Sequence, residues 1–240
     1  MLNPVEAYDR IAESYPRLSE QRRGYLSAIE RLIVAAIPQG GRSMLDIGAG
    51  DGVRALRIAQ TAELRDVVLL EPSAAMRRHW PAGVTAWPVR AEELHSQHGQ
   101  FDVITCLWNV LGHIFPGSAR VEVLRQCSRL LAPGGRIFID ISHRYNTAHY
   151  GWAATAWRFL RGSSGDVTVV WNPEGIRTTG HVFTDREFRQ LCRTAGLSIE
   201  RRFVVDYATG AVRQWSFQGQ LLYVLRNGDD LVSSDAGKKR

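Results

Sequence analysis

The residues that most constrain the fold of this 240-residue chain are 44–52, Met-Leu-Asp-Ile-Gly-Ala-Gly-Asp-Gly. A short apolar run contains an acid, Asp46, and glycine then recurs at every second position. Glycine is needed where the backbone takes a positive φ or approaches a ligand closely, because a side chain would clash there. The pattern predicts a buried strand that ends abruptly and turns into a helix beside a bound ligand.

A second acid indicates what that ligand is. Glu71 ends the next apolar run, 66–70, and an acid at this distance from a glycine turn is typical of ribose binding in α/β folds. The alternative interpretation is that Glu71 caps the helix that follows. The dinucleotide pattern G-x-G-x-x-G and the phosphate-binding loop that ends in Gly-Lys-Ser/Thr are both absent. We therefore expect a nucleoside cofactor other than NAD or ATP.

The D-x-G-x-G-x-G pattern that begins at Asp46 resembles the first motif of the class I S-adenosylmethionine-dependent methyltransferases. Three further segments resemble this family and occur in the family's order. Residues 71–76 resemble its ribose-binding segment, 101–104 its fourth strand, and 130–139 its junction between a helix and the fifth strand. The resemblance covers residues 44–140 and implies that S-adenosyl-L-methionine is the cofactor and S-adenosyl-L-homocysteine the product. A nucleotide-binding fold of another kind is the alternative.

Apolar runs alternate with helical patterns along the chain, which predicts an α/β fold with a doubly wound, Rossmann-like sheet. The expected helices are 51–61, 73–79, 118–131 and 184–195, the last opened by a capping box. The resemblance implies seven strands with the last one antiparallel. The strands are expected at 43–47, 66–71, 84–89, 101–106, 136–141, 197–205 and 219–226.

We expect one methyltransferase domain over residues 1–240, with three additions to the sheet. Residues 1–37 have helical spacing and form an N-terminal lid. Residues 142–182 form a substrate-side cap, inserted after the fifth strand, in which 167–171 and 176–183 make a hairpin around the turn 172–175. Residues 227–240 form a flexible tail.

Composition limits the partners. The three cysteines are scattered in apolar contexts, so we expect reduced thiols and a cytoplasmic location. No signal segment is visible and no apolar run could span a bilayer, so no membrane partner is expected. The net charge is +6, but the arginines are spread along the chain and only Lys238 and Lys239 are lysines. Nucleic acid is therefore not the expected partner, and the protein is expected to be a monomer or a homodimer.

The resemblance assigns the cofactor-binding residues. It implies that the backbone of Gly48, Ala49 and Gly50 approaches the methionine part, that Asp46 organises this turn, and that Glu71 holds the ribose. The remaining expected cofactor contacts are Tyr15, Pro72, Ala91, Glu92, Cys106 and Leu107. Arg90 stands where the family often has an acid, so we expect the adenine contact to come from the backbone of Ala91. Glu92 could instead begin an exposed helix.

The loop 106–114 follows the fourth strand and should lie at the carboxyl edge of the sheet, over the reacting methyl group. It resembles the loop of N-methyltransferases that act on glycine, sarcosine and amino sugars. A neutral His113 there could orient or deprotonate an ammonium or a hydroxyl group, although a structural histidine is the alternative. Trp108 and Asn109 lie in the same loop and are expected to bind the substrate.

Residues 143–146 form a second polar cluster after the fifth strand. Arg144 could pair with a substrate carboxylate or phosphate, and His143 and Tyr145 could act as base or hydrogen-bond donors. The alternative is a polar turn that stabilises the cap. No metal-binding pattern emerges, because His95 and His98 lack further ligands.

Aromatic residues complete the expected substrate site. Tyr8, with Tyr15, belongs to a Tyr-Asp-x-x-Ala-x-x-Tyr segment that resembles the lid of small-molecule methyltransferases, or else packs on an amphipathic helix. Trp152, Trp157, Trp171 and Trp215 either line an acceptor pocket or form a small core. The chain is thus expected to methylate a small molecule, at an amine nitrogen or a hydroxyl, with natural-product biosynthesis as one setting. The alternatives are an RNA or protein methyltransferase, and a protein that uses the same pocket for binding or for other chemistry.

Overall fold

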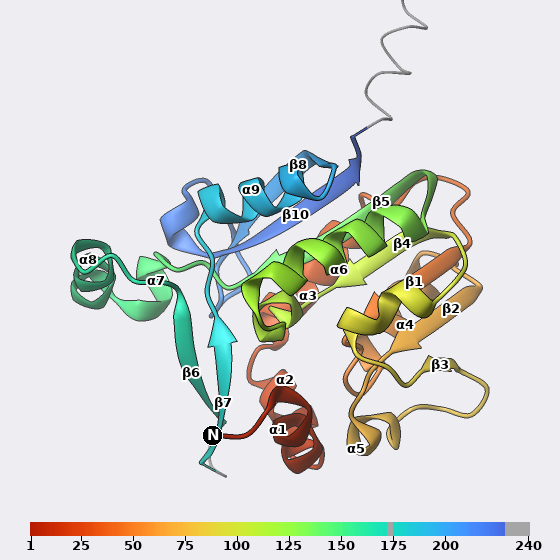
Figure 1. Ribbon diagram of the computed structural model, residues 1–240, viewed down its shortest axis with the longest axis horizontal. Coiled ribbons are helices and arrows are strands. Elements are labelled where there is room, and N and C mark those ends of the chain that lie inside the picture. The colour runs from red at the N-terminus through yellow and green to blue at the C-terminus, as the bar shows by residue number, and fades with distance from the viewer. Residues whose placement is uncertain (172–174, 229–240) are drawn as a thin grey trace, which may run out of the picture.

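A twisted sheet covered by helices on both faces forms the centre of the computed structural model, which describes residues 1–171 and 175–228 (Figure 1). The strand order is β3-β2-β1-β4-β5-β10-β8-β9, and neighbours among β1 to β5 are parallel. β10 is antiparallel to β5 and to β8, as expected for the last strand. The strands are β1 Ser43–Ile47, β2 Asp66–Leu70, β3 Thr85–Trp87, β4 Phe101–Cys106, β5 Leu131–Ile141, β8 Leu197–Val205, β9 Val212–Arg213 and β10 Gln220–Asn227.

The expected number of seven strands in this sheet is too low by one. The additional strand, β9, is two residues long and pairs with the edge strand β8. A strand this short has no alternation of apolar and polar residues, so the sequence carried no signal for it. The order of the strands reverses between β1 and β4, which is where ligands bind in doubly wound sheets.

Helices cover both faces of the sheet, and short 3-10 helices connect some of the elements. One face carries α3 and α4, and the other carries α6 and α9. The N-terminal segment, expected to be helical, forms three helices, and Pro16 lies in the first turn of α2, where its missing N–H leaves no helical hydrogen bond unmade. The helices are α1 Pro4–Ile11, α2 Tyr15–Glu20, α3 Arg23–Val34, α4 Val53–Thr61, α5 Ala74–Arg77, α6 Gly117–Leu130, α7 Thr147–Tyr150, α8 Trp152–Leu160 and α9 Asp185–Thr194, and the turns are η1 Ala91–Ser96, η2 Val110–His113 and η3 Ser216–Gln218.

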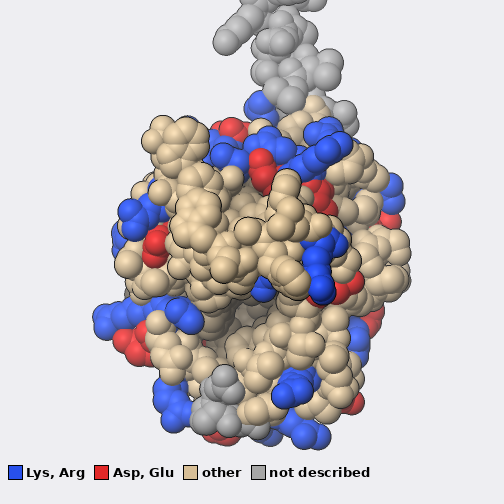
Figure 2. Space-filling model, turned by 90° about the vertical axis from the view of Figure 1, so that its left-hand side faces the viewer, with Lys and Arg blue, Asp and Glu red and all other residues tan. Residues whose placement is uncertain are grey.

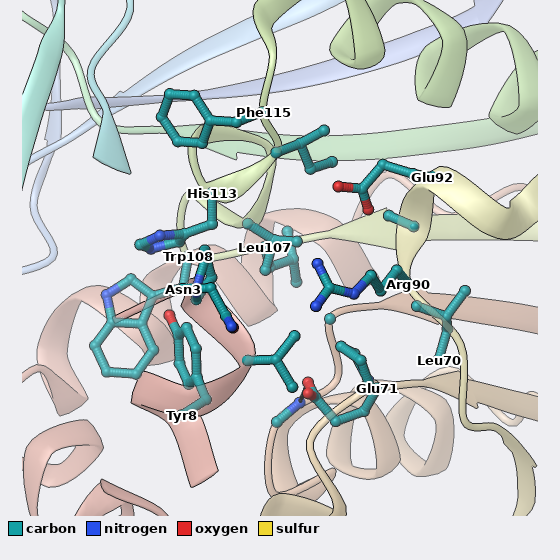
Figure 3. Close-up of a pocket in the computed structure, with 18 of the residues that line it drawn as sticks. Asn3, Tyr8, Leu70, Glu71, Arg90, Glu92, Leu107, Trp108, His113 and Phe115 are labelled. Carbon is teal, nitrogen blue, oxygen red and sulfur yellow. Dashed lines mark hydrogen bonds between the residues drawn. The ribbon is translucent and has the colours of Figure 1, made fainter. Parts of the chain in front are cut away.

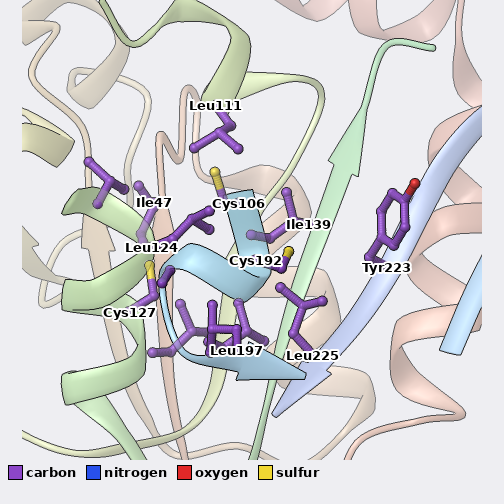
Figure 4. Close-up of a cluster of buried hydrophobic side chains, with 14 of the residues drawn as sticks. Ile47, Cys106, Leu111, Leu124, Cys127, Ile139, Cys192, Leu197, Tyr223 and Leu225 are labelled. Carbon is purple, nitrogen blue, oxygen red and sulfur yellow. The ribbon is translucent and has the colours of Figure 1, made fainter. Parts of the chain in front are cut away.

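The central strands are apolar on both faces because both faces are covered. Figure 4 shows the larger core, in which side chains of β1, β4, β5 and β10 meet those of α6 and α9. Cys106, Cys127 and Cys192 are all buried and unbridged in this cluster. Cys106 was expected at the cofactor, but its side chain packs in this core instead.

The cap after β5 consists of α7, α8 and a separate two-stranded hairpin, β6 Asp166–Trp171 and β7 Ile176–His181. Residues 172–174 of the expected turn and residues 229–240 of the expected tail lie outside the described residues, while Asn227 belongs to β10. Within the described ranges, every helix is too short or too polar to cross a bilayer.

Candidate active site

The glycine turn after β1 has the conformation that the sequence predicts. Gly48, Gly50 and Gly52 have φ angles of +72°, +57° and +74°. A Cβ atom on Gly48 would lie 2.6 Å from Val110 Cγ2, so a side chain there would meet both backbone strain and a clash. The amides of Gly48 and Ala49 both donate to the carbonyl oxygen of Leu70, at 2.8 and 3.0 Å, and thereby fasten the turn to the end of β2.

The Glu71 carboxylate lies across this turn. Its Oε2 accepts from the Gly50 amide at 2.9 Å, and its Oε1 accepts from the Ser73 amide at 2.8 Å. Burial raises the pKa of Glu71, and the two amide donors partly oppose that rise. A carboxylate oxygen can accept more than one hydrogen bond, so each oxygen keeps capacity for a ligand hydroxyl. The helix that follows, α5, is capped by Ser73, whose hydroxyl accepts from the Met76 amide at 3.1 Å, so the alternative that Glu71 caps it is wrong. Glu71 lines the cavity described next.

A cavity of about 290 Å³ lies above the glycine turn, between α1, the loop after β4 and the segment before η1. Figure 3 shows Glu71, Arg90 and Glu92 on one side of it and Tyr8, Trp108 and His113 on the other. Mostly apolar walls with a few polar groups are typical of small-molecule sites. The lining residues are Asn3, Pro4, Val5, Tyr8, Tyr15, Gly48, Gly50, Leu70, Glu71, Pro72, Arg90, Ala91, Glu92, Leu107, Trp108, Val110, His113, Ile114 and Phe115.

Helix α1 covers the cavity, and hydrogen bonds hold the segment that contains it to both sides of the cavity. Asn3 begins it with a capping box. The Asp9 carboxylate accepts from the Ser73 hydroxyl at 2.6 Å and from the Ala75 amide at 3.1 Å, next to Glu71. At the other end the Leu2 amide donates to the Arg177 carbonyl in β7 at 2.9 Å. This segment thus joins the glycine-turn side of the cavity to the cap.

A hydrogen bond to His113 fixes which of its ring nitrogens carries the proton. Its Nδ1 lies 3.1 Å from the carbonyl oxygen of Thr179 in β7. A carbonyl can only accept, so Nδ1 carries the proton and Nε2 keeps a free lone pair. Burial lowers the pKa of His113, and the Thr179 carbonyl partly opposes this. The ring is therefore neutral near pH 7, and it meets the Tyr8 ring edge-on at 5.7 Å between centroids.

A buried polar layer lies beneath the turn. Asp46 accepts from the Thr105 hydroxyl, and burial raises its pKa to about 6. Asp140 accepts from the Tyr25 hydroxyl at 2.6 Å. The Arg54 guanidinium interacts electrostatically with both acids, yet its Nε is buried without a hydrogen-bond partner. Asp46 does not hold the amides of the turn, since the Leu70 carbonyl does so.

Beside the main cavity lies a smaller polar pocket of about 70 Å³. Ala49, expected at the cofactor, lines this pocket together with Arg54, and Tyr15 and Trp108 separate it from the main cavity by lining both. The Arg54 side chain, whose Nε has no hydrogen-bond partner, therefore lines the same pocket as Ala49 of the glycine turn.

Two predicted substrate residues are used inside the protein instead. Asn109 has φ +61°, its amide nitrogen donates to the His181 carbonyl at 3.0 Å, and its oxygen accepts from the Ser142 amide at 2.9 Å. The Arg144 guanidinium donates to the carbonyls of residues 182, 163 and 164 and to the Glu187 carboxylate at 2.6 Å. Neither side chain has a free polar group that faces the cavity. The alternative of a polar turn that stabilises the cap is the one that describes Arg144.

His143 and Tyr145, expected at the reacting centre, lie outside the cavity lining. The two rings pack edge-on against each other at 6.2 Å, and Tyr145 also meets Phe159 of the cap. Burial lowers the pKa of His143 to about 4, and its Nδ1 has no partner. They are separated from His113 because the segment after β5 leads into the cap rather than over the glycine turn.

Several lining residues were not expected. Asn3, Pro4 and Val5 had a detectable signal, since Asn-Pro three residues before Glu6 marks a helix start ahead of the tyrosine segment. Val110 and Ile114 belong to the loop 106–114, which was expected over the methyl group, but they and Phe115 were not singled out because apolar residues after a strand are indistinguishable from core. Within the described residues, no group of three His, Cys, Asp or Glu side chains is placed to hold a metal ion.

The chain is similar to several known proteins. The methyltransferase domain family matches residues 17–201. A ubiquinone biosynthesis O-methyltransferase of Pseudomonas paraeruginosa is 36% identical over 45% of this chain and 48% of its own length. The one from Thiobacillus denitrificans is 29% identical over 74% and 73%. The match thus spans about half the length of the first of these curated relatives.

A solved structure of similar fold is the Burkholderia thailandensis 1,6-didemethyltoxoflavin-N1-methyltransferase with bound 1,6-didemethyltoxoflavin and S-adenosylhomocysteine. It has a TM-score of 0.62 and 17% identity, and the alignment covers 93% of this chain and 87% of that one. At this identity the likeness concerns the fold.

Proposed function

The chain belongs to the family of class I S-adenosylmethionine-dependent methyltransferases, and from this premise we propose that it methylates a small molecule at an oxygen or nitrogen whose proton His113 accepts. The observation that carries the proposal is the Nδ1 contact of His113 with the Thr179 carbonyl. It leaves a neutral imidazole with a free Nε2 at the wall of the cavity that also contains the glycine turn and Glu71.

The residues around the glycine turn fit the cofactor. Glu71 has one remaining acceptor site on each oxygen for the two ribose hydroxyls. Gly48 and Gly50 leave room for the close approach of a ligand to the backbone. The unpartnered Nε of Arg54 suits the methionine carboxylate. When bound, S-adenosylmethionine supplies a methyl group on a cationic sulfonium.

The protein's own contribution to the chemistry is positioning and proton removal. Apolar walls and helix α1 exclude water, which favours an aligned arrangement of acceptor and cofactor. An acceptor hydroxyl or amine must lose a proton, and the neutral imidazole of His113 can take it at Nε2. The Thr179 carbonyl then stabilises the resulting imidazolium through Nδ1–H.

The cavity walls favour a flat, apolar acceptor. Val110, Ile114, Phe115 and Tyr8 line the same cavity as His113, so a ring-bearing molecule would bury apolar surface there. A hydroxyl is the preferred acceptor group, since the curated relatives are named as O-methyltransferases. The amine expected from the loop 106–114 remains the second candidate, because a neutral His113 would equally take a proton from an ammonium ion.

A methylation screen tests the acceptor class. Purified protein with labelled S-adenosylmethionine is offered separate pools of ring hydroxyls, amines, tRNA and a protein lysate. We expect label in the hydroxyl pool, with the amine pool second. Label confined to tRNA or protein would replace this proposal with its alternatives, and cofactor binding without transfer to any pool would indicate a binding protein.

The role of His113 is tested by His113→Ala. We expect kcat to fall by about tenfold or more, as is usual for general acid–base residues, while the affinity for S-adenosylhomocysteine changes little. The rate of the parent should fall as the pH drops through the His113 pKa, on the acidic side of the ordinary histidine range. His98→Ala, on an exposed loop, serves as the control. A fully active His113→Ala of lower thermal stability would show that the ring only packs.

A further inference from the structure

Six large apolar side chains stand exposed on one part of the cap and on the turn beside it. They belong to α8 and to the segment around η3, and the Trp152 and Phe217 rings meet at 5.8 Å, which joins the two segments. Trp215 stacks on Phe217 at 6.5 Å. Their exposed fractions range from 37% to 80%. We call the six together the aromatic face: Trp152, Trp157, Phe159, Leu160, Trp215 and Phe217.

The aromatic face is not part of a core or of the active-site cavity. α8 buries only Thr155 of its nine residues, and no member of the face lines the cavity. Of the four tryptophans expected in an acceptor pocket or a small core, only Trp171 turns inward, to pack on Tyr8 at 5.6 Å. Clustered apolar side chains that a fold leaves in water usually mark a surface that something else covers.

The charges around the aromatic face indicate what covers it. The sequence has no Asp or Glu from 142 to 165 or from 207 to 228. Of the five arginines there, the two in or next to α8 lie over aromatic rings, Arg161 over Trp157 and Arg158 over Tyr150, each at 3.9 Å from the ring centroid. Arg144 and Arg213 pair instead with Glu187 and Asp206, outside these two ranges. In addition, Arg158 Nη1 is buried without a hydrogen-bond partner.

We propose that the aromatic face rests on an anionic lipid surface, with α8 lying in the plane of the headgroups. Tryptophan and phenylalanine on one side of a short helix, together with arginine and without acids, are the composition of an interfacial helix. Arginine binds phosphate oxygens while its stem lies along apolar groups, and tryptophan has an apolar ring with one polar N–H that suits the headgroup region. The sequence led us to expect no membrane partner, because no apolar run could span a bilayer, and this proposal departs from that expectation.

Two other occupants fit the same observations less well. A second copy of the chain would bring Arg158 and Arg161 of both copies together across a twofold axis, with no acid in the segment to neutralise them. Single-stranded RNA would gain from stacking on the tryptophans, but the most exposed member, Leu160, offers no ring to stack on. A lipid surface uses the rings, the leucine and the arginines at once.

The surface contact would also orient the active site. α8 leads directly into the β6–β7 hairpin, whose Thr179 holds His113. Figure 2 shows this side of the molecule, where a mostly tan surface is hollowed at its centre and most of the charged side chains stand around it. An apolar acceptor dissolved in the bilayer would then lie next to the cap. This last step rests on the proposed function, whereas the lipid contact itself does not.

The test is sedimentation of the full chain with vesicles of phosphatidylcholine alone or with about a third phosphatidylglycerol. We expect binding to the anionic vesicles, weaker binding to the neutral ones, and a decrease between about 0.1 M and about 0.5 M salt. Replacing Trp157, Phe159 and Leu160 together by serine should lower the bound fraction about tenfold or more. Arg161→Glu should also weaken binding, and Arg65→Glu, an exposed arginine at the far end of β2, is the matched control.

The serine variant changes only exposed side chains, so its circular dichroism and its affinity for S-adenosylhomocysteine should match those of the parent. Equal vesicle binding by the parent and this variant would overturn the proposal, as would a parent that stays in the supernatant with both vesicles. A concentration-dependent dimer that the serine substitutions abolish, without vesicle binding, would assign the face to a second copy. Loss of oligo(U) binding without vesicle binding would assign it to RNA. None of these readouts requires methyl transfer, so the result is independent of the acceptor.

Discussion

The two walls of the cavity are built in different ways. On the glycine-turn side, polar groups hold the backbone over short distances in sequence, as when Glu71 accepts from the amide of Gly50, 21 positions earlier. On the cap side, segments that are remote in sequence meet through side-chain hydrogen bonds. His113 and Thr179 are 66 positions apart, and Asn109 and His181 are 72 apart. The first wall is thus a local backbone structure, while the second exists only when the cap is docked.

This difference separates cofactor binding from cap docking. A change in the glycine turn should affect both stability and cofactor affinity, because the same atoms serve both. A change in the cap should lower stability and acceptor binding but spare the cofactor. Three variants test this division, and they are ordered from the largest expected effect to the smallest.

Gly48→Ala should have the largest effect. The new Cβ meets Val110 at 2.6 Å in a left-handed backbone, so strain and overpacking together should cost about 3 kcal/mol. Affinity for S-adenosylhomocysteine should fall about a hundredfold or be lost, as measured by calorimetry. The control is Gly83→Ala, which has a similar φ of +87° and open space, so it should cost only about 1 kcal/mol and leave the affinity unchanged. Equal effects at the two positions would show that backbone strain alone decides.

Arg144→Met tests the cap. It removes the donor to three carbonyls and to Glu187, so urea unfolding should show a loss of about 2 kcal/mol. Affinity for S-adenosylhomocysteine should stay within about twofold, while the acceptor KM rises. Arg189→Met removes only a more exposed pair with Asp185 and should cost less than about 0.5 kcal/mol. If Arg144→Met weakened the cofactor as much as the acceptor, the two walls would not be separable.

Asp46→Asn tests whether the buried Asp46 charge beneath the glycine turn lowers the stability of the unliganded protein. Burial raises the Asp46 pKa from 3.8 to about 6, so folding favours the protonated form. That contribution is fully present below pH 3.8 and is lost as the pH rises through 6, which leaves a buried charge at pH 7.5. Asn, which still accepts from Thr105, should therefore stabilise the unliganded protein by about 1–2 kcal/mol at pH 7.5. The gain should vanish near pH 4, and a gain independent of pH would contradict the assignment.

The glycine-turn wall was the more predictable one for a physical reason. Positive φ angles, close approach of a ligand and the end of a strand restrict which residue types can stand at neighbouring positions. For this reason Gly48, Gly50 and Glu71 could be named from the sequence. The roles of Asn109, Arg144 and His143 could not, because a polar side chain after a strand looks the same whether it faces a ligand or a carbonyl. What these side chains contact depends on where residues 163–171 and 175–187 lie in the folded chain, and the local sequence around each side chain does not carry that information. The outward orientation of Trp152 and Trp157 was likewise invisible, since a helix of nine residues fits a core or a surface equally well.

The fastening of α1 at both ends has a thermodynamic consequence. Asp9 ties this helix to Ser73 and Ala75 on one wall, and Leu2 ties it to β7 on the other. A ligand that steadies one attachment lowers the cost of ordering the helix for the ligand at the other. Such coupling is reciprocal, so the acceptor must tighten the cofactor by the same factor by which the cofactor tightens the acceptor. The same reciprocity holds for the two products, so the release of either product lowers the affinity of the protein for the other.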